Sequence, residues 1–252
     1  MTGLIVVAAA ASETGLVRQN NEDAAYLGRW LYAVADGMGG HAAGEVASAA
    51  VIGSLHACDA EVPPADLLVT LGRGVAAANA EVARRAAEDP ARRGMGTTLT
   101  AMLWSGDQAA LAHIGDSRAF LLRDSQLREI TEDHTIGHLV SDAGFLAPVL
   151  SRYLDGRPDR SPDLTLRELR PGDRYLLCSD GLSPEVSSEA IGDALLSAGD
   201  APAVVSQLVA LAEAAGAPDN VTVIVVDVRE AGAGAGPTDP VTLGAAADVL
   251  AH

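Results

Sequence analysis

The sequence predicts an α+β fold in which helices pack against the faces of antiparallel β-sheets. Apolar segments with strand character occur in adjacent groups and are separated by Gly, Asp and Asn turns, as expected for neighbouring strands. Segments with helical periodicity come in pairs. A parallel sheet would require a regular alternation of strand and helix, so this grouping favours antiparallel sheets.

Each expected element follows from its local pattern. Helices are predicted at 41–58, 64–88, 187–198 and 202–215, and the second opens with Pro64 and closes before Pro90. Strands are predicted at seven apolar ranges: 3–10, 24–35, 97–104, 108–115, 118–123, 174–178 and 221–228. One large domain is predicted over residues 1–230. The sequence from Ala231 reads AGAGAGPTDP, so residues 231–252 are predicted to be a flexible Gly/Ala/Pro-rich tail with nothing to pack.

The composition excludes several classes of protein. The chain has 252 residues, with 34 acidic side chains against 17 basic ones, and all 17 basic residues are arginine. Without lysine there can be no P-loop lysine, no Schiff base and no lysine general base. A net charge of −17 argues against a nucleic-acid partner, because binding to the phosphate backbone depends on clustered basic side chains. A hydrophobic content of 48% excludes a disordered acidic tail.

Neither cysteines nor apolar runs indicate export or membrane insertion. Cys58 and Cys178 are the only cysteines, too few for a disulfide framework or a Cys-rich zinc site. The apolar run from Leu4 to Ala11 lacks a preceding basic segment and is too short to span a bilayer. We therefore expect a cytoplasmic protein without a membrane span, and a monomer by default.

Four aspartates lie at the ends of predicted strands. Asp36 and Asp180 each follow a strand and precede glycine, Asp116 lies in a Gly-Asp-Ser turn, and Asp219 immediately precedes the strand at 221–228. Each of them alone is explained as a common turn former. All four together suggest that the rims of two stacked sheets bring distant strand ends to one place.

Converging carboxylates would repel one another unless a cation neutralised them. The candidate ligands are hard oxygen atoms, to which Gly37 could add a backbone carbonyl, so magnesium or manganese fits better than zinc or copper. Two such ions can activate water and hold a phosphoryl group.

A second polar cluster precedes the strand at 24–35: Arg18 is suited to bidentate capture of phosphate, and Glu22 and Asp23 could hold metal-bound water. A solvated polar loop is the alternative explanation of this cluster.

Six segments stand out together along the chain: Arg18…Asn21-Glu22-Asp23, Val34-Ala35-Asp36-Gly37-Met38-Gly39-Gly40-His41…Gly44-Glu45, Gly94-Met95-Gly96-Thr97-Thr98, His113-Ile114-Gly115-Asp116-Ser117-Arg118, Leu177-Cys178-Ser179-Asp180-Gly181-Leu182 and Pro218-Asp219-Asn220-Val221-Thr222. In this order they resemble the signature segments of the metal-dependent PP2C-type (PPM) serine/threonine phosphatases, above all the bacterial branch. The resemblance covers about residues 8–229. It implies a central sandwich of two antiparallel sheets flanked by helix pairs.

The resemblance also implies roles for individual residues. Asp36 would bridge two Mn²⁺ or Mg²⁺ ions, the Gly37 carbonyl would bind one of them, and Asp180 and Asp219 would hold the other. Asp116 with Asp180 would hold a third ion, Glu22 and Asp23 would act through metal-bound water, and Arg18 would bind the substrate phosphate. The implied reaction is direct attack of metal-activated water on phosphoserine or phosphothreonine in protein substrates, opposing a Ser/Thr kinase.

Two departures from the family pattern affect the site. Animal members carry a histidine after the Asp-Gly pair as the proposed general acid, whereas this chain has Met38. His41 is a candidate for that role, although a histidine that caps or packs at a helix start explains it equally well. The flap segment at about 131–156 is shortened and lacks the His-Pro-x-Arg sequence. The sequence therefore does not decide whether this flap supports a third metal.

Three other functions have partial support in the sequence. A serine hydrolase based on Ser117 lacks a downstream Asp-x-x-His, and a cysteine phosphatase based on Cys178 lacks the required arginine five residues later. A catalytically silent phosphoprotein-binding relative would normally have lost a metal-binding aspartate, and none is missing. The shortened flap keeps this last alternative open.

Overall fold

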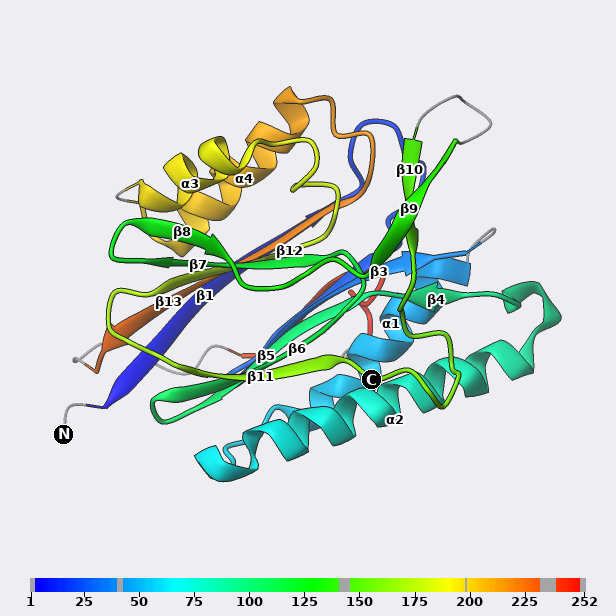
Figure 1. Ribbon diagram of the computed structural model, residues 1–252, viewed down its shortest axis with the longest axis horizontal. Coiled ribbons are helices and arrows are strands. Elements are labelled where there is room, and N and C mark those ends of the chain that lie inside the picture. The colour runs from blue at the N-terminus through cyan, green and yellow to red at the C-terminus, as the bar shows by residue number, and fades with distance from the viewer. Residues whose placement is uncertain (1–2, 40–42, 141–145, 198, 232–238, 250–252) are drawn as a thin grey trace.

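The structure, a computed structural model, describes residues 3–39, 43–140, 146–197, 199–231 and 239–249. It has four layers, with two antiparallel sheets in the middle and helices outside each sheet (Figure 1). The predicted α+β sandwich is therefore confirmed. Helices α1 (Ala43–Leu55) and α2 (Leu67–Glu88) cover one sheet, and α3 (Ser188–Leu196) and α4 (Ala201–Ala214) cover the other.

The two sheets are built from antiparallel neighbours. The five-stranded sheet has the order β1 (Leu4–Glu13), β13 (Val221–Glu230), β12 (Arg174–Cys178), β7 (Arg118–Arg123) and β8 (Gln126–Glu129). The seven-stranded sheet has the order β11 (Asp163–Glu168), β6 (Gln108–Ile114), β5 (Leu99–Ser105), β3 (Leu31–Met38), β2 (Asp23–Leu27) and β14 (Val241–Gly244), with the short β4 (Gly96–Thr97) also paired to β3. A separate hairpin is formed by β9 (Thr135–Val140) and β10 (Leu146–Leu150).

Three layers of apolar side chains hold the sandwich together. Successive residues of a strand point to opposite faces of its sheet. In β13, Val223 and Val225 therefore pack with the α3–α4 layer, while Ile224 and Val226 pack between the sheets. The third core joins α1 and α2 to the seven-stranded sheet. Because both faces of β13 are covered, its sequence is a continuous apolar run rather than an alternating one.

The predicted strand at 24–35 is wrong as a single element, because it contains β2, a tight turn and β3. The Asp59 carboxylate accepts hydrogen bonds from the backbone N–H groups of Arg29, Trp30 and Leu31, at 2.7–3.1 Å. Asp59, which follows the 3₁₀ turn His56–Cys58 after α1, thereby fixes the turn between β2 and β3. The edge strands β8 and β11 were not predicted, since their exposed positions carry many polar side chains and lack a long apolar run.

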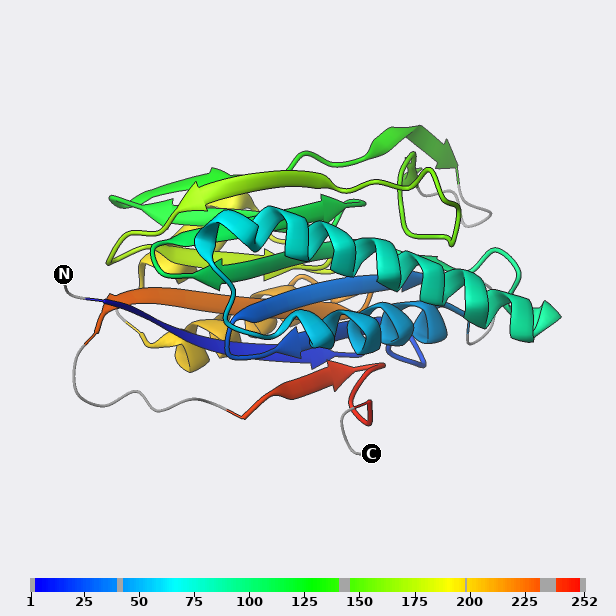
Figure 2. The ribbon, with the colours of Figure 1, turned by 90° about the horizontal axis from the view of Figure 1, so that it is seen from below.

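The prediction that the chain packs against nothing after residue 230 is wrong for residues 239–249. Strand β14 pairs with β2, with Val241 opposite Leu27 and Gly244 opposite Ala24 (Figure 2). Ala246, in the turn that follows, is fully buried. Strand pairing uses backbone groups, so a Gly/Ala/Pro-rich composition did not prevent it. Within the described residues, no helix has the length and apolarity needed to cross a membrane.

Candidate metal and phosphate site

The four strand-end aspartates lie at one end of the sandwich. Strands β2 and β3 place Asp23 directly opposite Asp36, and Asp180 and Asp219 flank the paired ends of β12 and β13. The β6–β7 turn supplies Asp116. A pocket of about 560 Å³ opens there, and it is lined by Arg18, Glu22, Asp36, Gly37, Met38, Gly39, Thr98, Asp116, Val149, Leu150, Tyr153, Asp180, Asp219 and Asn220. The prediction that these strand ends converge is confirmed by this pocket.

Backbone contacts on both sides fix the Asp36–Gly37 segment. The Asp36 N–H donates to Thr98 Oγ1 at 2.9 Å, and the Asp36 carbonyl accepts from the Thr98 N–H and the Thr97 hydroxyl. At Gly37, a Cβ atom would lie 2.2 Å from the carbonyl oxygen of Gly44 in α1. Only glycine allows this close approach between β3 and the start of α1.

Asp23 is more deeply buried than Asp116, with a relative exposure of 1% against 8%. Its Oδ2 accepts a hydrogen bond of 2.7 Å from the Ser179 hydroxyl, which itself accepts from the Thr222 N–H. This chain of contacts connects β2 to the ends of β12 and β13 across the two sheets. Asp23 therefore lies behind the pocket and is absent from its lining.

Asn220 organises the loop that carries Arg18 and Glu22. Its Oδ1 accepts from the Glu22 N–H at 2.8 Å, and its Nδ2 donates to the carbonyls of Thr14 and Asn20. Sequence reasoning assigned no role to Asn220, Ser179 or Thr98, although all three lie inside the motifs that it identified. Their polar side chains next to the predicted ligands were the available signal.

Arg18 lies at the mouth of the pocket, where its side chain is 52% exposed. Its Nη2 is 2.6 Å from Asp219 Oδ2. The guanidinium therefore faces the carboxylates from the solvent side, and its N–H groups that have no partner among the described residues can bind an entering anion.

Among the residues that the structure describes, the Arg18–Asp219 pair is the one ion pair formed by the carboxylates at this site. No ion pair in the described part of the chain involves Asp23, Asp36, Asp116 or Asp180. Burial raises the pKa of Asp23 to about 7 despite the hydrogen bond from Ser179. Burial, reinforced by neighbouring carboxylates, also raises the pKa of Asp116 to about 7 and shifts the pKa values of Asp36 and Asp180 upward. Ionising them all would require a cation.

The donor set fits a hard divalent cation. Carboxylate oxygens, a glycine carbonyl and the polar loop suit Mg²⁺ or Mn²⁺, and no cysteine lines the pocket among the described residues. The His, Cys, Asp and Glu side chains of the described residues include no ready-made group of three around a single point. Bound ions would therefore also depend on backbone and water oxygens, which is usual for Mg²⁺.

The flap segment at 131–156 forms the β9–β10 hairpin beside the pocket. Its base is fixed by His134, whose N–H donates to the Gly115 carbonyl and whose Nδ1 accepts from the Gly115 N–H at 3.1 Å. The His134 carbonyl also accepts from the Ser151 N–H. The turn that presents Asp116 and the two ends of the hairpin are thus joined through one residue. His41 lies outside the described residues.

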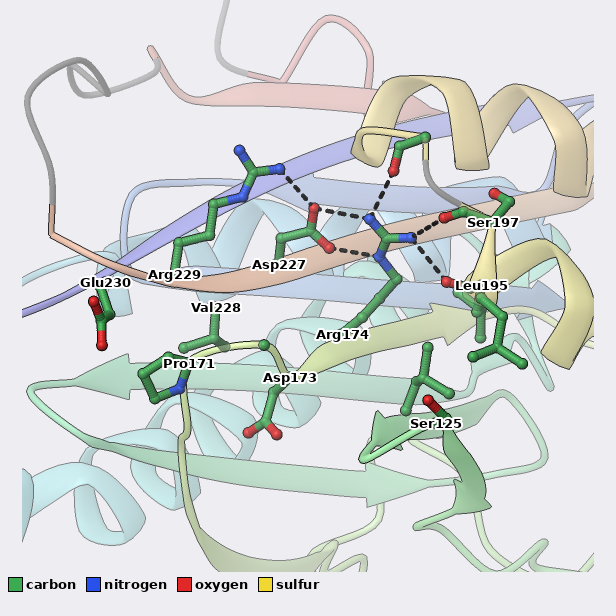
Figure 3. A pocket seen from close by; sticks show the side chains of 14 residues that line it. Ser125, Pro171, Asp173, Arg174, Leu195, Ser197, Asp227, Val228, Arg229 and Glu230 are labelled. Carbon is green, nitrogen blue, oxygen red and sulfur yellow. Dashed lines mark hydrogen bonds and ion pairs between the residues drawn. The ribbon is translucent and has the colours of Figure 1, made fainter.

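A second pocket, of about 480 Å³, lies at the opposite end of β12 and β13 (Figure 3). There Arg174 donates to both oxygens of Asp227, at 2.6 and 3.1 Å, and to the carbonyls of Leu195, Ser197 and Gly199. Arg229 Nη2 also donates to Asp227 Oδ2 at 2.9 Å. Through these contacts the pocket residues Arg174 and Asp227 join α3 to the sheet.

Comparisons with known proteins agree with this geometry. The profile of the Protein phosphatase 2C family matches residues 12–220. The serine/threonine protein phosphatase PstP of Mycobacterium tuberculosis is 47% identical over 255 residues, covering 96% of this chain and 48% of PstP. The chain thus spans about half the length of this relative. The protein phosphatase PhpP of Streptococcus pneumoniae is 32% identical, covering 87% of this chain and 96% of PhpP.

Solved structures give the same result. The crystal structure of M. tuberculosis PstP superposes with a TM-score of 0.83 at 46% identity, covering 90% of this chain and 100% of that chain. The PstP catalytic domain in complex with two manganese ions gives a TM-score of 0.82 at 48% identity, with the same coverage. On sequence and fold, the chain belongs to the protein phosphatase 2C family.

Proposed function

We propose that this chain is a metal-dependent protein phosphatase that hydrolyses phosphoserine and phosphothreonine by direct attack of water. The observation that supports it most strongly is the convergence of Asp36, Asp116, Asp180 and Asp219 on one pocket with a single arginine at its mouth. Such a site binds divalent cations and then a phosphate, because the cations and the arginine together offset the negative charge of both.

Asp36, Asp180, Asp219 and the Gly37 carbonyl are proposed to hold two Mn²⁺ or Mg²⁺ ions, with Asp116 and Asp180 at a third. When bound, these ions would supply Lewis-acid stabilisation of the phosphoryl oxygens and a water of lowered pKa.

The chain's own groups orient the substrate. Arg18 is proposed to bind the phosphoryl oxygens at the mouth, where it is accessible to a phosphorylated side chain on another protein. Glu22, whose N–H donates to Asn220, is proposed to orient water together with the adjacent Asp23, whose carboxylate accepts from the Ser179 hydroxyl. Val149, Leu150 and Tyr153 line the flap side of the pocket, where they would limit the access of bulk water.

The substrates are proposed to be proteins phosphorylated by a Ser/Thr kinase, in a monomeric cytoplasmic enzyme. Two relatives with this fold are named serine/threonine or protein phosphatases, which supports this substrate class. The domain is proposed to include residues 239–249 in addition to 1–230, since β14 completes the seven-stranded sheet.

The test is hydrolysis of p-nitrophenyl phosphate and of a phosphothreonine peptide with added Mn²⁺ or Mg²⁺, and with EDTA. Turnover should require the metal, and Asp36→Asn should abolish it. Asp107→Asn, an exposed carboxylate in the β5–β6 turn, is the matched control and should retain full activity. If neither metal supports turnover but phosphopeptides still bind, the silent phosphoprotein-binding module is the correct function.

A further inference from the structure

Residues 239–249 return to the sandwich next to the candidate metal site. After β14 pairs with β2, the chain turns so that the Ala245 N–H donates to the Asp23 carbonyl at 2.7 Å. The turn continues through hydrogen bonds from Ala247 to Gly244 and from Val249 to Ala246. Val249 then reaches α1, where a Cβ at Gly53 would lie 3.0 Å from its side chain. The segment is therefore attached to both β2 and α1.

Gly244 lies against the backbone of Asp23. Its φ is +63°, and a Cβ atom at this position would lie 2.2 Å from the Asp23 carbonyl oxygen and 2.7 Å from the Ser12 hydroxyl. A side chain here would be strained and would also overlap backbone that cannot move aside cheaply. The end of β14 can approach Asp23 this closely only because residue 244 is glycine.

The contact matters because Asp23 is the first residue of the short strand β2. Its carboxyl group lies opposite Asp36 in the strand register and is bonded to Ser179. Ends of strands fray most easily, and β2 would be the edge of its sheet without β14. Pairing on the outer side thus restrains the backbone that carries this carboxyl group.

We propose that residues 239–249 are a positioning element of the metal site, acting through the backbone of Asp23. This inference rests on the proposed function, and it adds a segment beyond residue 220, where the family match ends. Gly244 and Ala245 are positioning residues, because they contact Asp23 rather than any reacting atom. Outer contacts that orient metal-binding groups typically change metal affinity 10- to 100-fold when they are lost.

The experiment measures Mn²⁺ binding to the metal-free 252-residue chain by titration calorimetry. Gly244→Ala forces β14 away from Asp23, and Ala245→Pro removes the N–H that donates to the Asp23 carbonyl. For each variant, the Kd for Mn²⁺ should rise roughly tenfold. At saturating Mn²⁺, kcat and the KM for p-nitrophenyl phosphate should return to near the parent values, because Arg18 and Asp219 lie elsewhere in the pocket.

The matched control is Val241→Thr, at the other end of β14 opposite Leu27, where the side chain is 40% exposed. Its Kd should stay within about twofold of the parent value, as expected for a surface substitution. Hydrogen exchange of the β2 amides should quicken in Gly244→Ala and stay unchanged in Val241→Thr.

Two results overturn the inference. One is a Gly244→Ala chain that melts at a lower temperature yet binds Mn²⁺ with parent affinity, which would mean that the segment only covers a sheet edge. The other is a parent chain that does not bind Mn²⁺. If the parent chain binds Mn²⁺ and the affinities differ as expected, but no substrate is hydrolysed, the positioning role stands and the proposed phosphatase function fails.

Discussion

The two ends of the β12–β13 strand pair hold carboxylates in opposite ways. At one end, Asp227 is 8% exposed and is paired with Arg174, which also binds three carbonyls of the α3–α4 connection (Figure 3). At the other end, Asp180 and Asp219 face a pocket shared with Asp36 and Asp116, and the one ion pair formed there within the described residues is the exposed Arg18–Asp219 contact.

The difference separates structural carboxylates from functional ones. A buried carboxylate with an arginine partner contributes to folding by joining two elements. Its oxygen atoms already accept hydrogen bonds from the arginine, so they are not available to a ligand. Asp173 with Arg123 and Asp155 with Arg160 follow the same pattern. Carboxylates gathered without a partner oppose folding until a cation arrives, so their presence has to be explained by what they bind.

The largest expected effect is a loss of activity on substitution of Asp180, at the metal-site end of β12 and β13. Asp180→Ala should reduce kcat/KM at least about a hundredfold, because it removes a group proposed to contact two metal sites. The metal-free protein should be no less stable than the parent, since a source of repulsion is lost. Steady-state kinetics with Mn²⁺ and urea unfolding in EDTA check both statements. A variant that keeps half the parent rate would show that the site is misplaced.

At the other end of the strand pair, where Asp227 is paired with Arg174, we expect a loss of stability without a loss of activity. Asp227→Asn should lower the free energy of unfolding by roughly 3 kcal/mol, because it leaves the buried Arg174 guanidinium without its charge partner. Its kcat/KM below the melting transition should match that of the parent. Urea unfolding followed by circular dichroism measures the loss. A loss of less than about 1 kcal/mol in the free energy of unfolding would mean that the Arg174–Asp227 pair contributes little to folding.

The pH dependence of stability should differ with and without metal. In the folded chain, the pKa values of Asp23 and Asp116 are raised to about 7, from about 4 in an unfolded chain. At pH 6.5 the folded state therefore still holds protons that the unfolded state has released, and it loses them as the pH rises through 7, so stability falls from pH 6.5 to about pH 8. The buried His113, whose pKa is lowered to about 4, acts in the opposite direction only below this range.

Differential scanning fluorimetry in EDTA should show this fall in Tm between pH 6.5 and 8.5. Saturating Mg²⁺ should remove it, because a cation stabilises the ionised carboxylates. Asp23→Asn should weaken the slope in EDTA, whereas the exposed Asp107→Asn should leave it unchanged. A Tm that rises with pH in EDTA would contradict the raised pKa values.

The smallest effect is expected at the exposed arginine. Arg18→Ala should raise the KM for a phosphothreonine peptide roughly tenfold with little loss of kcat, as expected for one exposed hydrogen bond to a charged group. Arg18→Lys should recover part of the loss, because lysine retains the charge and loses the bidentate geometry. Arg29→Ala, at an exposed turn away from the pocket, is the control. Equal KM values for Arg18→Ala and the parent would exclude Arg18 from phosphate binding.

Much of the site could be predicted because its signals are local. Asp36, Asp180 and Asp219 each adjoin an apolar strand, and such positions lie at sheet rims wherever the strands are paired. Gly37 could be singled out as a position without a side chain, but its closeness to Gly44 of α1 appeared only in the structure. The supporting groups Ser179 and Asn220 were missed because their partners, Asp23 and Glu22, lie more than 150 residues away in the chain.

Antiparallel sheets, helix pairs and an oxygen-rich cluster could be predicted from the sequence, since apolar periodicity and turn residues are local properties of the chain, and the family resemblance added the two-sheet sandwich. Only the tertiary structure decided which carboxylates have an arginine partner and which do not. It also decided that residues 239–249 belong to the seven-stranded sheet. Their contact with Asp23 is made by backbone N–H and C=O groups, which nearly every residue carries. No side-chain pattern in the sequence therefore predicts it.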